Sequence, residues 1–79
     1  TLTNGYTYSA IVFLGKPSGG SYSTMVIPKS AFSTTDYQYE LADNSGYRTF
    51  KVRYSGNDII VTGVGSLNNG SITNIYGLL

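Results

Sequence analysis

At 79 residues, the chain is expected to form a single domain over its whole length, because separate hydrophobic cores appear only in much longer chains. It has no cysteine and no histidine, which excludes disulfides and a zinc site of the usual ligand types. A formal net charge of +1 lacks the basic excess of nucleic-acid-binding proteins, so we expect no nucleic-acid partner.

A domain this small has little hydrophobic core, and such a core rarely supplies more than roughly 3–5 kcal/mol. Because disulfides and zinc are excluded, association with other copies, or with the rest of a longer chain, is the favoured source of further stability. The chain opens at Thr1 without a methionine or a signal-like segment. We therefore expect a fragment from the C-terminal end of a larger protein.

The composition predicts an all-β domain. Glycine, serine, threonine and asparagine make up 35 of the 79 residues, and tyrosine adds 8. Threonine, tyrosine, valine and isoleucine suit a half-buried pleated surface, while glycine and asparagine suit turns. The longest apolar run, residues 10–14, is far too short to cross a bilayer, so no membrane insertion is expected.

The first half of the chain contains two predicted strands. Residues 6–14 alternate at first, but residues 11–14 are apolar on both faces, which is typical of a strand covered on both sides. The glycines and Pro17 of residues 15–20 then predict a loop. A second strand over residues 22–27 ends at Pro28, and residues 29–32 suit one helical turn or a bend.

Four more strands are predicted in the second half. Residues 37–42 alternate and lead through a turn at residues 43–46 into a strand over residues 47–54. In that strand Phe50, Val52 and Tyr54 are predicted to face inward, whereas Thr49, Lys51 and Arg53 face water. A strand over residues 59–62 is blurred by Gly63 and Gly65, the run 68–70 (NNG) indicates a tight hairpin, and residues 71–76 form the last strand.

Turn signals every ~8–12 residues favour a small antiparallel β-sandwich of about six strands, with jelly-roll, meander or Greek-key connections. The end of the chain is apolar to its last residue, although chain ends are usually polar unless held in place. Either the last strand lies in the middle of a sheet, or it packs against symmetry mates. The candidate oligomer contacts are Ile72, Ile75, Tyr76, Leu78 and Leu79.

No catalytic machinery is predicted, and we expect the chain not to be an enzyme. Serine and threonine have no histidine to act as a base, and no cysteine is present. Of the four acids, three are aspartates at predicted turns, where such residues usually cap the local backbone. We expect no catalytic residue, no metal and no cofactor.

Binding chemistry suits the composition better, because tyrosine offers a large contact area at low entropic cost. The turn and the strand start after it place a carboxylate, an amide, a ring and a guanidinium within six residues. Each tyrosine could equally be an ordinary core or interface residue of a strand. The candidate ligand contacts are Asp43, Asn44, Tyr47 and Arg48, together with Tyr37 and Tyr39.

Two regions resemble a known family. Both are similar to the C-terminal domains of tailed-bacteriophage tail fibres and tailspikes. The first region is residues 25–32 (MVIPKSAF), and the second consists of residues 50–54 (FKVRY), 57–62 (NDIIVT) and 72–77 (ITNIYG). The resemblance spans roughly residues 25–79 and consists of strand patterns and turns. It implies an extracellular, trimeric tip of a virion appendage that often binds host cell-surface polysaccharide, with any enzymatic activity in an upstream domain.

Three functional hypotheses follow. The first is a homotrimeric tail-fibre or tailspike terminal domain that attaches the virion to a host-surface glycan. The second is a purely structural trimerisation or assembly domain without a ligand. The third is a carbohydrate-binding module appended to a polysaccharide-degrading enzyme.

Overall fold

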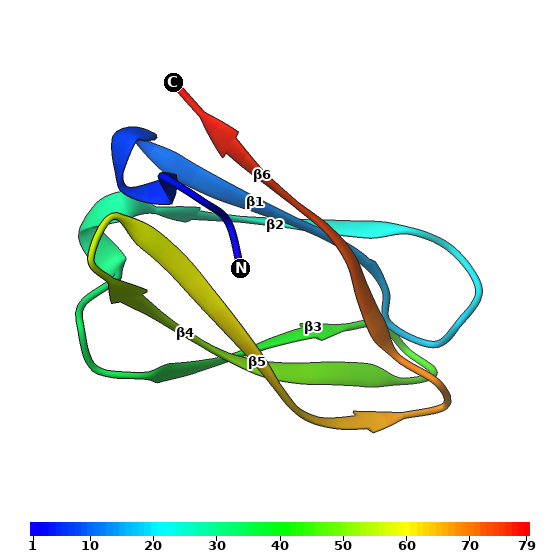
Figure 1. The fold of residues 1–79 in the computed structure, drawn as a ribbon. Coiled ribbons are helices and arrows are strands. Elements are labelled where there is room, and N and C mark those ends of the chain that lie inside the picture. Colours follow the sequence, from blue (N-terminus) through cyan, green and yellow to red (C-terminus); the bar gives the residue numbers. More distant parts are fainter.

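The computed structural model describes residues 1–79 as two antiparallel three-stranded sheets packed face to face (Figure 1). Two one-turn 3-10 helices, η1 (Gly5–Thr7) and η2 (Lys29–Ala31), complete the fold, and neither is long and apolar enough to cross a membrane. The predicted six-stranded all-β architecture is confirmed. The strands are β1 (Ala10–Lys16), β2 (Ser23–Pro28), β3 (Tyr37–Ala42), β4 (Tyr47–Ser55), β5 (Asp58–Leu67) and β6 (Ser71–Leu78).

The chain crosses between the two sheets after β5. Strands β3, β4 and β5 form a meander in the order β3-β4-β5, whereas β6 pairs with β1 in the sheet β2-β1-β6. The expectation that the last strand lies in the middle of a sheet is therefore wrong, because β6 is an edge strand. Asn68 and Asn69 do form a tight turn with positive φ angles of 56° and 64°. That turn joins two sheets, so the predicted hairpin is also wrong.

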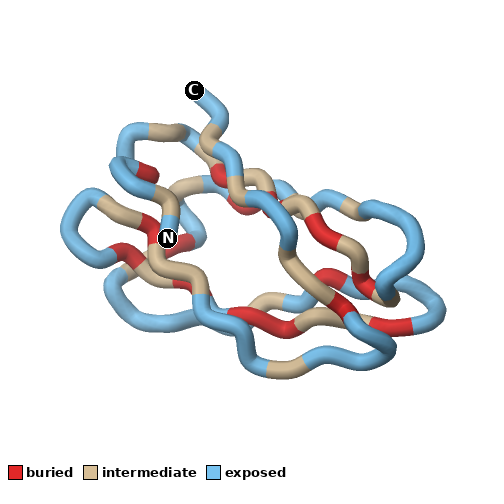
Figure 2. The backbone as a smooth tube through the Cα atoms, turned by 45° about the vertical axis from the view of Figure 1, so that its right-hand side comes forward, coloured by how far each residue is buried: buried red, intermediate tan, exposed pale blue.

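The core fills the space between the sheets, where the buried positions of the tube lie in Figure 2. The rings of Phe13 on β1 and Phe50 on β4 meet at its centre, with centroids 5.0 Å apart. In β4 the inward positions of Phe50, Val52 and Tyr54 are confirmed by their burial. The nine buried apolar side chains are Ile11, Phe13, Ile27, Phe32, Leu41, Phe50, Val52, Tyr54 and Ile59.

The N-terminal segment differs from the prediction. The first strand begins at Ala10 rather than at residue 6, because the preceding residues fold over the start of β5. Leu2 forms an isolated antiparallel bridge with Ile59, and the backbone N–H of Tyr6 donates to the carbonyl of Asn57 at 3.0 Å. The backbone pairing of this segment with β5 therefore decides its structure, although its residues alternate as they would in a strand. The helical turn expected within residues 29–32 is confirmed as η2.

Glycines predicted to end strands are instead accommodated within them. β1 continues through Gly15 to Lys16, and β5 continues through Gly63 and Gly65 to Leu67. The pairing register shifts beside both stretches, as at a β-bulge, which is a common feature of edge strands such as β5 and β6.

One outward position of β4 is buried against expectation. Thr49 is 9% exposed, and its hydroxyl donates to the carbonyl of Gly65 on β5 at 3.2 Å. This hydrogen bond spans the register shift between β4 and β5, where Gly65 has no side chain to hold the strands apart. The prediction that Thr49 faces water is therefore wrong.

Candidate functional site

Three turns meet at one end of the sandwich, which we call the loop end: residues 17–22, 43–46 and 68–70 (Figure 1). Asp43 links the first two of these turns. One of its carboxylate oxygens accepts the backbone N–H groups of Ser45 and Gly46, in its own turn, at 2.7 and 2.9 Å. Its other oxygen accepts the hydroxyl of Ser18 at 2.8 Å. The side-chain amide of Asn68 donates to the carbonyl of Ser45. The loop end is thus cross-linked by polar contacts.

The pKa of Asp43 is lowered, chiefly by the hydrogen bond from the Ser45 backbone and then by the Ser18 hydroxyl. The carboxylate therefore stays ionised and holds its own turn, as aspartate commonly does. Asn44, next to it, is exposed at the tip of the turn and makes none of the hydrogen bonds that organise the loop end.

Tyr47 and Arg48 point to opposite sides of β4. Tyr47 pairs with Ala42 and lies on the outer face of its sheet, where it is half-buried. Arg48 pairs with Leu41, whose side chain is buried, and so it lies on the inner face. A ligand at the loop end could not meet both side chains on one surface.

Tyr37 and Tyr39 lie towards the other end of β3. Tyr37 is five residues from Ala42, or about 17 Å along an antiparallel strand. Tyr39 packs against the core, with its ring centroid 6.1 Å from that of Phe50, and its hydroxyl donates to the carbonyl of Ala31 at 3.3 Å. Burial raises the pKa of Tyr39, and neighbouring Tyr37 adds to the effect.

The six candidate ligand contacts therefore do not form one cluster. Asp43 and Asn44 lie at the loop end, Tyr47 lies on an outer face, Arg48 lies between the sheets, and the two tyrosines of β3 lie further along that strand. Tyr37 remains 54% exposed and available to a partner.

The outer face of the sheet β2-β1-β6 is apolar over two neighbouring rows, and the row after them holds Thr24, Leu14 and Asn74. Val26, Val12 and Tyr76 form one cross-strand row, and Pro28, Ala10 and Leu78 form the next. Val26, Tyr76 and Leu78 are 55%, 47% and 45% exposed, which is unusual for large apolar side chains in neighbouring rows. We call these residues, with Leu14, the apolar sheet face. In the sequence this face was indicated by residues 11–14, which are apolar on both faces of the predicted strand.

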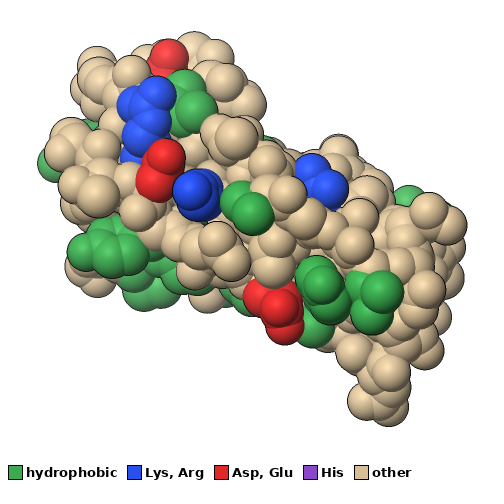
Figure 3. All heavy atoms as spheres, turned by 90° about the horizontal axis from the view of Figure 1, so that it is seen from below, with side chains coloured by type: hydrophobic (Ala, Val, Ile, Leu, Met, Phe, Trp, Pro, Cys, Tyr) green, Lys and Arg blue, Asp and Glu red, His purple; other side chains and the backbone are tan.

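The outer face of the other sheet carries charged side chains. Figure 3 views the molecule from that side and shows acidic and basic side chains there, together with hydrophobic ones. Lys51 is exposed there, and Arg53 forms an ion pair with Asp36 at 3.8 Å. The two outer faces therefore differ in charge, because this one has an exposed lysine and an ion pair, whereas the two apolar rows of the sheet β2-β1-β6 carry no charged side chain.

The candidate oligomer contacts divide between two places. Tyr76 and Leu78 belong to the apolar sheet face, and Leu79 follows β6 and is 99% exposed. Ile72 and Ile75 point to the inner side of β6, since they pair with Gly15 and Phe13. These two isoleucines line a cleft.

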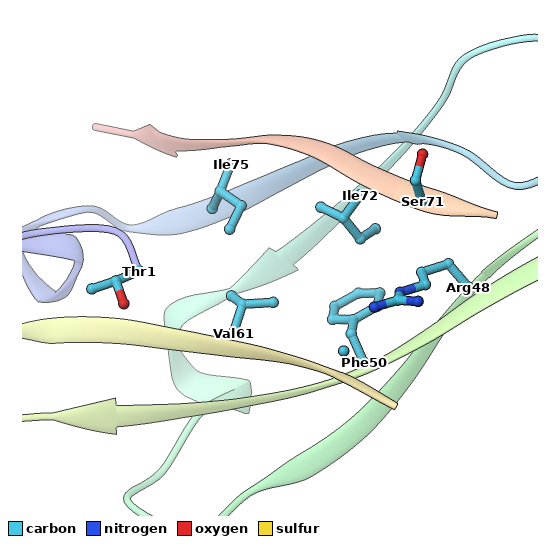
Figure 4. A pocket seen from close by; sticks show the side chains of 8 residues that line it. Thr1, Arg48, Phe50, Val61, Ser71, Ile72 and Ile75 are labelled. Atoms are coloured by element: carbon cyan, nitrogen blue, oxygen red, sulfur yellow. The ribbon is translucent and has the colours of Figure 1, made fainter. Parts of the chain in front are cut away.

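The cleft lies between the edge strands β5 and β6 and has a volume of about 340 Å³ (Figure 4). Sequence reasoning did not find it, because the cleft exists only where the crossing of β6 leaves two edge strands opposite each other. Four of its eight lining residues are apolar, and the others are one arginine, one glycine and two small polar residues. The lining residues are Thr1, Arg48, Phe50, Val61, Gly63, Ser71, Ile72 and Ile75.

A second hollow lies at the end opposite the loop end, beside η1 and η2. The ammonium group of Lys29 lies 3.7 Å from the ring centroid of Tyr6, and the ring of Tyr6 meets that of Tyr54 edge-on. The hydroxyl of Tyr54 donates to the carbonyl of Lys29 at 3.2 Å. Lys29 thus covers one face of the Tyr6 ring.

Comparison with protein-family models, with curated proteins and with solved structures finds no significant match to this chain. Its function is therefore inferred from its own residues and their arrangement.

Proposed function

We propose that the chain is a non-catalytic association domain whose apolar sheet face joins copies of it into a homotrimer. The terminal domain of a virion tail fibre or tailspike has such a task. The observation that supports this proposal most is that two neighbouring rows on one outer face are apolar and uncharged, whereas the other outer face carries charged side chains. The solvent-exposed face of an antiparallel sheet normally carries polar side chains, and a large exposed apolar patch marks an interaction site.

The energy available from covering this face is comparable with that of the small core. Val26, Tyr76 and Leu78 each keep about half of their surface exposed. Complete burial of an aliphatic side chain contributes about 1.5–3 kcal/mol, so covering the exposed half contributes about 1 kcal/mol each from Val26 and Leu78, and about 2 kcal/mol from the larger ring of Tyr76. The sum over one subunit is about 4 kcal/mol, similar to what a core of this size supplies.

A second copy of the chain suits this face better than a charged partner does. Val12 and Leu14 continue the face along β1, and its two rows carry no charged side chain. Three copies can bring this face to a common axis, where each apolar patch packs against those of its two neighbours without leaving a charge buried and unpaired. The opposite face keeps its ion pair in water.

Sedimentation velocity over a range of micromolar concentrations tests the proposal, with Val26→Lys as the perturbing variant. We expect a trimer for the unmodified chain and a folded monomer for Val26→Lys, because the substitution places a charge in the contact. Val64→Lys is the matched control, since Val64 is 49% exposed on β5 and lies outside this face. A monomer at every concentration, as in an isolated carbohydrate-binding module, would refute the association, and a dimer would refute the trimer.

Attachment to a host-surface glycan is a second candidate, and the loop end supports it. Tyr22 there is 60% exposed, with the ammonium group of Lys16 4.7 Å from its ring centroid. Exposed Asn44 adds an amide to the same end. An aromatic ring with amide and hydroxyl groups offers the stacking and hydrogen bonds that a sugar needs.

A glycan array separates the second candidate from a purely structural domain. We expect a specific signal that Tyr22→Ala or Asn44→Ala removes, whereas Tyr37→Ala, at the other end of β3, keeps it. No signal for the unmodified chain across a broad array of host polysaccharides would favour assembly without a ligand.

A further inference from the structure

Arg48 is a half-buried arginine without a partner in the chain. Its side chain lies on the inner face of β4 and enters the cleft beside Phe50 (Figure 4). Gly63 on β5 makes room for it, because a side-chain carbon at Gly63 would collide with the guanidinium. The chain's one ion pair involves Arg53, and no hydrogen bond holds the Arg48 guanidinium.

None of the four acidic side chains can neutralise Arg48. Asp36 pairs with Arg53, and Asp43 holds its turn at the loop end. Asp58 accepts the backbone N–H of Asn4 at 2.9 Å, and Glu40 pairs with Thr49 on the outer face of its sheet. A buried or partly buried charge is costly unless it is paired. The cleft therefore contains an unmatched positive charge.

The two ends of the cleft also differ in polarity. In Figure 4, Arg48 and Ser71 lie at one end, whereas Val61, Ile75 and Thr1 lie at the other, with Ile72 between them. Its apolar part is formed by side chains from both sheets, on β5 and β6. The volume of about 340 Å³ falls within the range of roughly 300–1,000 Å³ that is usual for small-molecule sites.

We propose that this cleft binds a small amphipathic monocarboxylate, with its carboxylate on Arg48 and its apolar chain between Val61 and Ile75. A planar guanidinium matches a carboxylate bidentately, and such charge-assisted hydrogen bonds are the stronger ones. The ligand supplies the negative charge that the chain does not, and it covers apolar side chains on two edge strands. This site is separate from the apolar sheet face, because Ile72 and Ile75 point inward and Tyr76 points outward.

Titration of the labelled full chain with octanoate, followed by NMR of the methyl groups and the arginine Nε–H groups, tests the proposal. We expect saturable shifts at Val61, Ile72, Ile75 and Arg48. Acetate lacks the chain and octan-1-ol lacks the charge, so each should bind at least about tenfold more weakly. Equal affinity for octan-1-ol and octanoate, or shifts confined to other residues, would overturn the proposal.

Arg48→Gln should weaken octanoate binding at least about tenfold, in line with the loss of a hydrogen-bonded charge. The variant is expected to fold, because Arg48 has no hydrogen bond or ion pair to lose, and Arg48→Lys should bind with intermediate affinity. Arg53→Gln is the matched control on the outer face of the same strand and should bind as the unmodified chain does. Unchanged binding by Arg48→Gln would overturn the assignment.

The ligand proposal and the association proposal fail separately. Val26→Lys, expected to be monomeric, should still bind octanoate, because the cleft is formed within one copy. Octanoate binding by a chain that never associates would leave the cleft proposal standing alone. A trimer that shows no cleft shifts at any octanoate concentration would refute the cleft proposal and retain the association.

Discussion

Replacing Tyr76 by threonine should weaken the proposed association while leaving the fold of one copy almost unchanged. The ring points outward from β6 and is 47% exposed, and threonine also favours strands. An aromatic side chain has about 150–250 Å² of surface to bury, so about 90 Å² of Tyr76 is still open to a partner. At about 25 cal/mol per Å², covering it contributes about 2 kcal/mol per subunit.

For three subunits this contribution reaches about 6 kcal/mol, which corresponds to an association constant about 10⁴-fold weaker in Tyr76→Thr. Sedimentation equilibrium at several concentrations measures the constant, and thermal unfolding of the dilute protein verifies the fold. Tyr37→Thr is the matched control, since Tyr37 is 54% exposed but lies on β3 of the other sheet. The role of the apolar sheet face would be refuted if both variants weakened association equally, or if neither variant weakened it.

Three further predictions concern the fold. Gly70→Ala should lower the free energy of unfolding in urea by about 1–3 kcal/mol, because the new carbon would collide with the backbone oxygens of Tyr47 and Pro17, whereas Gly65→Ala, with its nearest atom 3.5 Å away, should cost less. Because the pKa of Asp43 is lowered in the folded state, its contribution to stability is complete above about pH 4 and is lost as the pH falls further; Asp43→Asn should reduce the acid dependence of the melting temperature. Burial raises the pKa of Tyr39 and Tyr54, so their contribution to stability is complete below about pH 10 and is lost as the pH rises further. Tyrosinate absorbance should show both ionising above about pH 10, and a titration in which neither does so would contradict this.

Patterns of neighbouring residues predicted the parts of the fold that depend on them. In β3 the alternation of Tyr39 and Leu41 with polar residues matches the observed faces, and β3 itself has the predicted bounds. In β4 the inward side is also the predicted one. These predictions succeed because successive side chains of a strand must point to opposite faces, whatever the strand pairs with.

The same patterns could not predict the site. Arg48 and Tyr47 are neighbours in sequence, yet one enters the cleft and the other lies on an outer face. Asp43 looked like a ligand contact, but its oxygens hold the turn through Ser45, Gly46 and the distant Ser18. A contact between residues in different turns has no signature in the local sequence.

The sequence by itself determined that the chain is a small all-β domain without disulfides, with a first strand apolar on both sides and an apolar last strand. Only the tertiary structure decided that β6 leaves its neighbour β5 and pairs with β1 at a sheet edge. Alternation specifies which side chains share a face, but it does not specify which strand lies alongside. That choice depends on how two whole sheets pack, and it places Ile72 and Ile75 in a cleft while Tyr76 and Leu78 remain on the outer face.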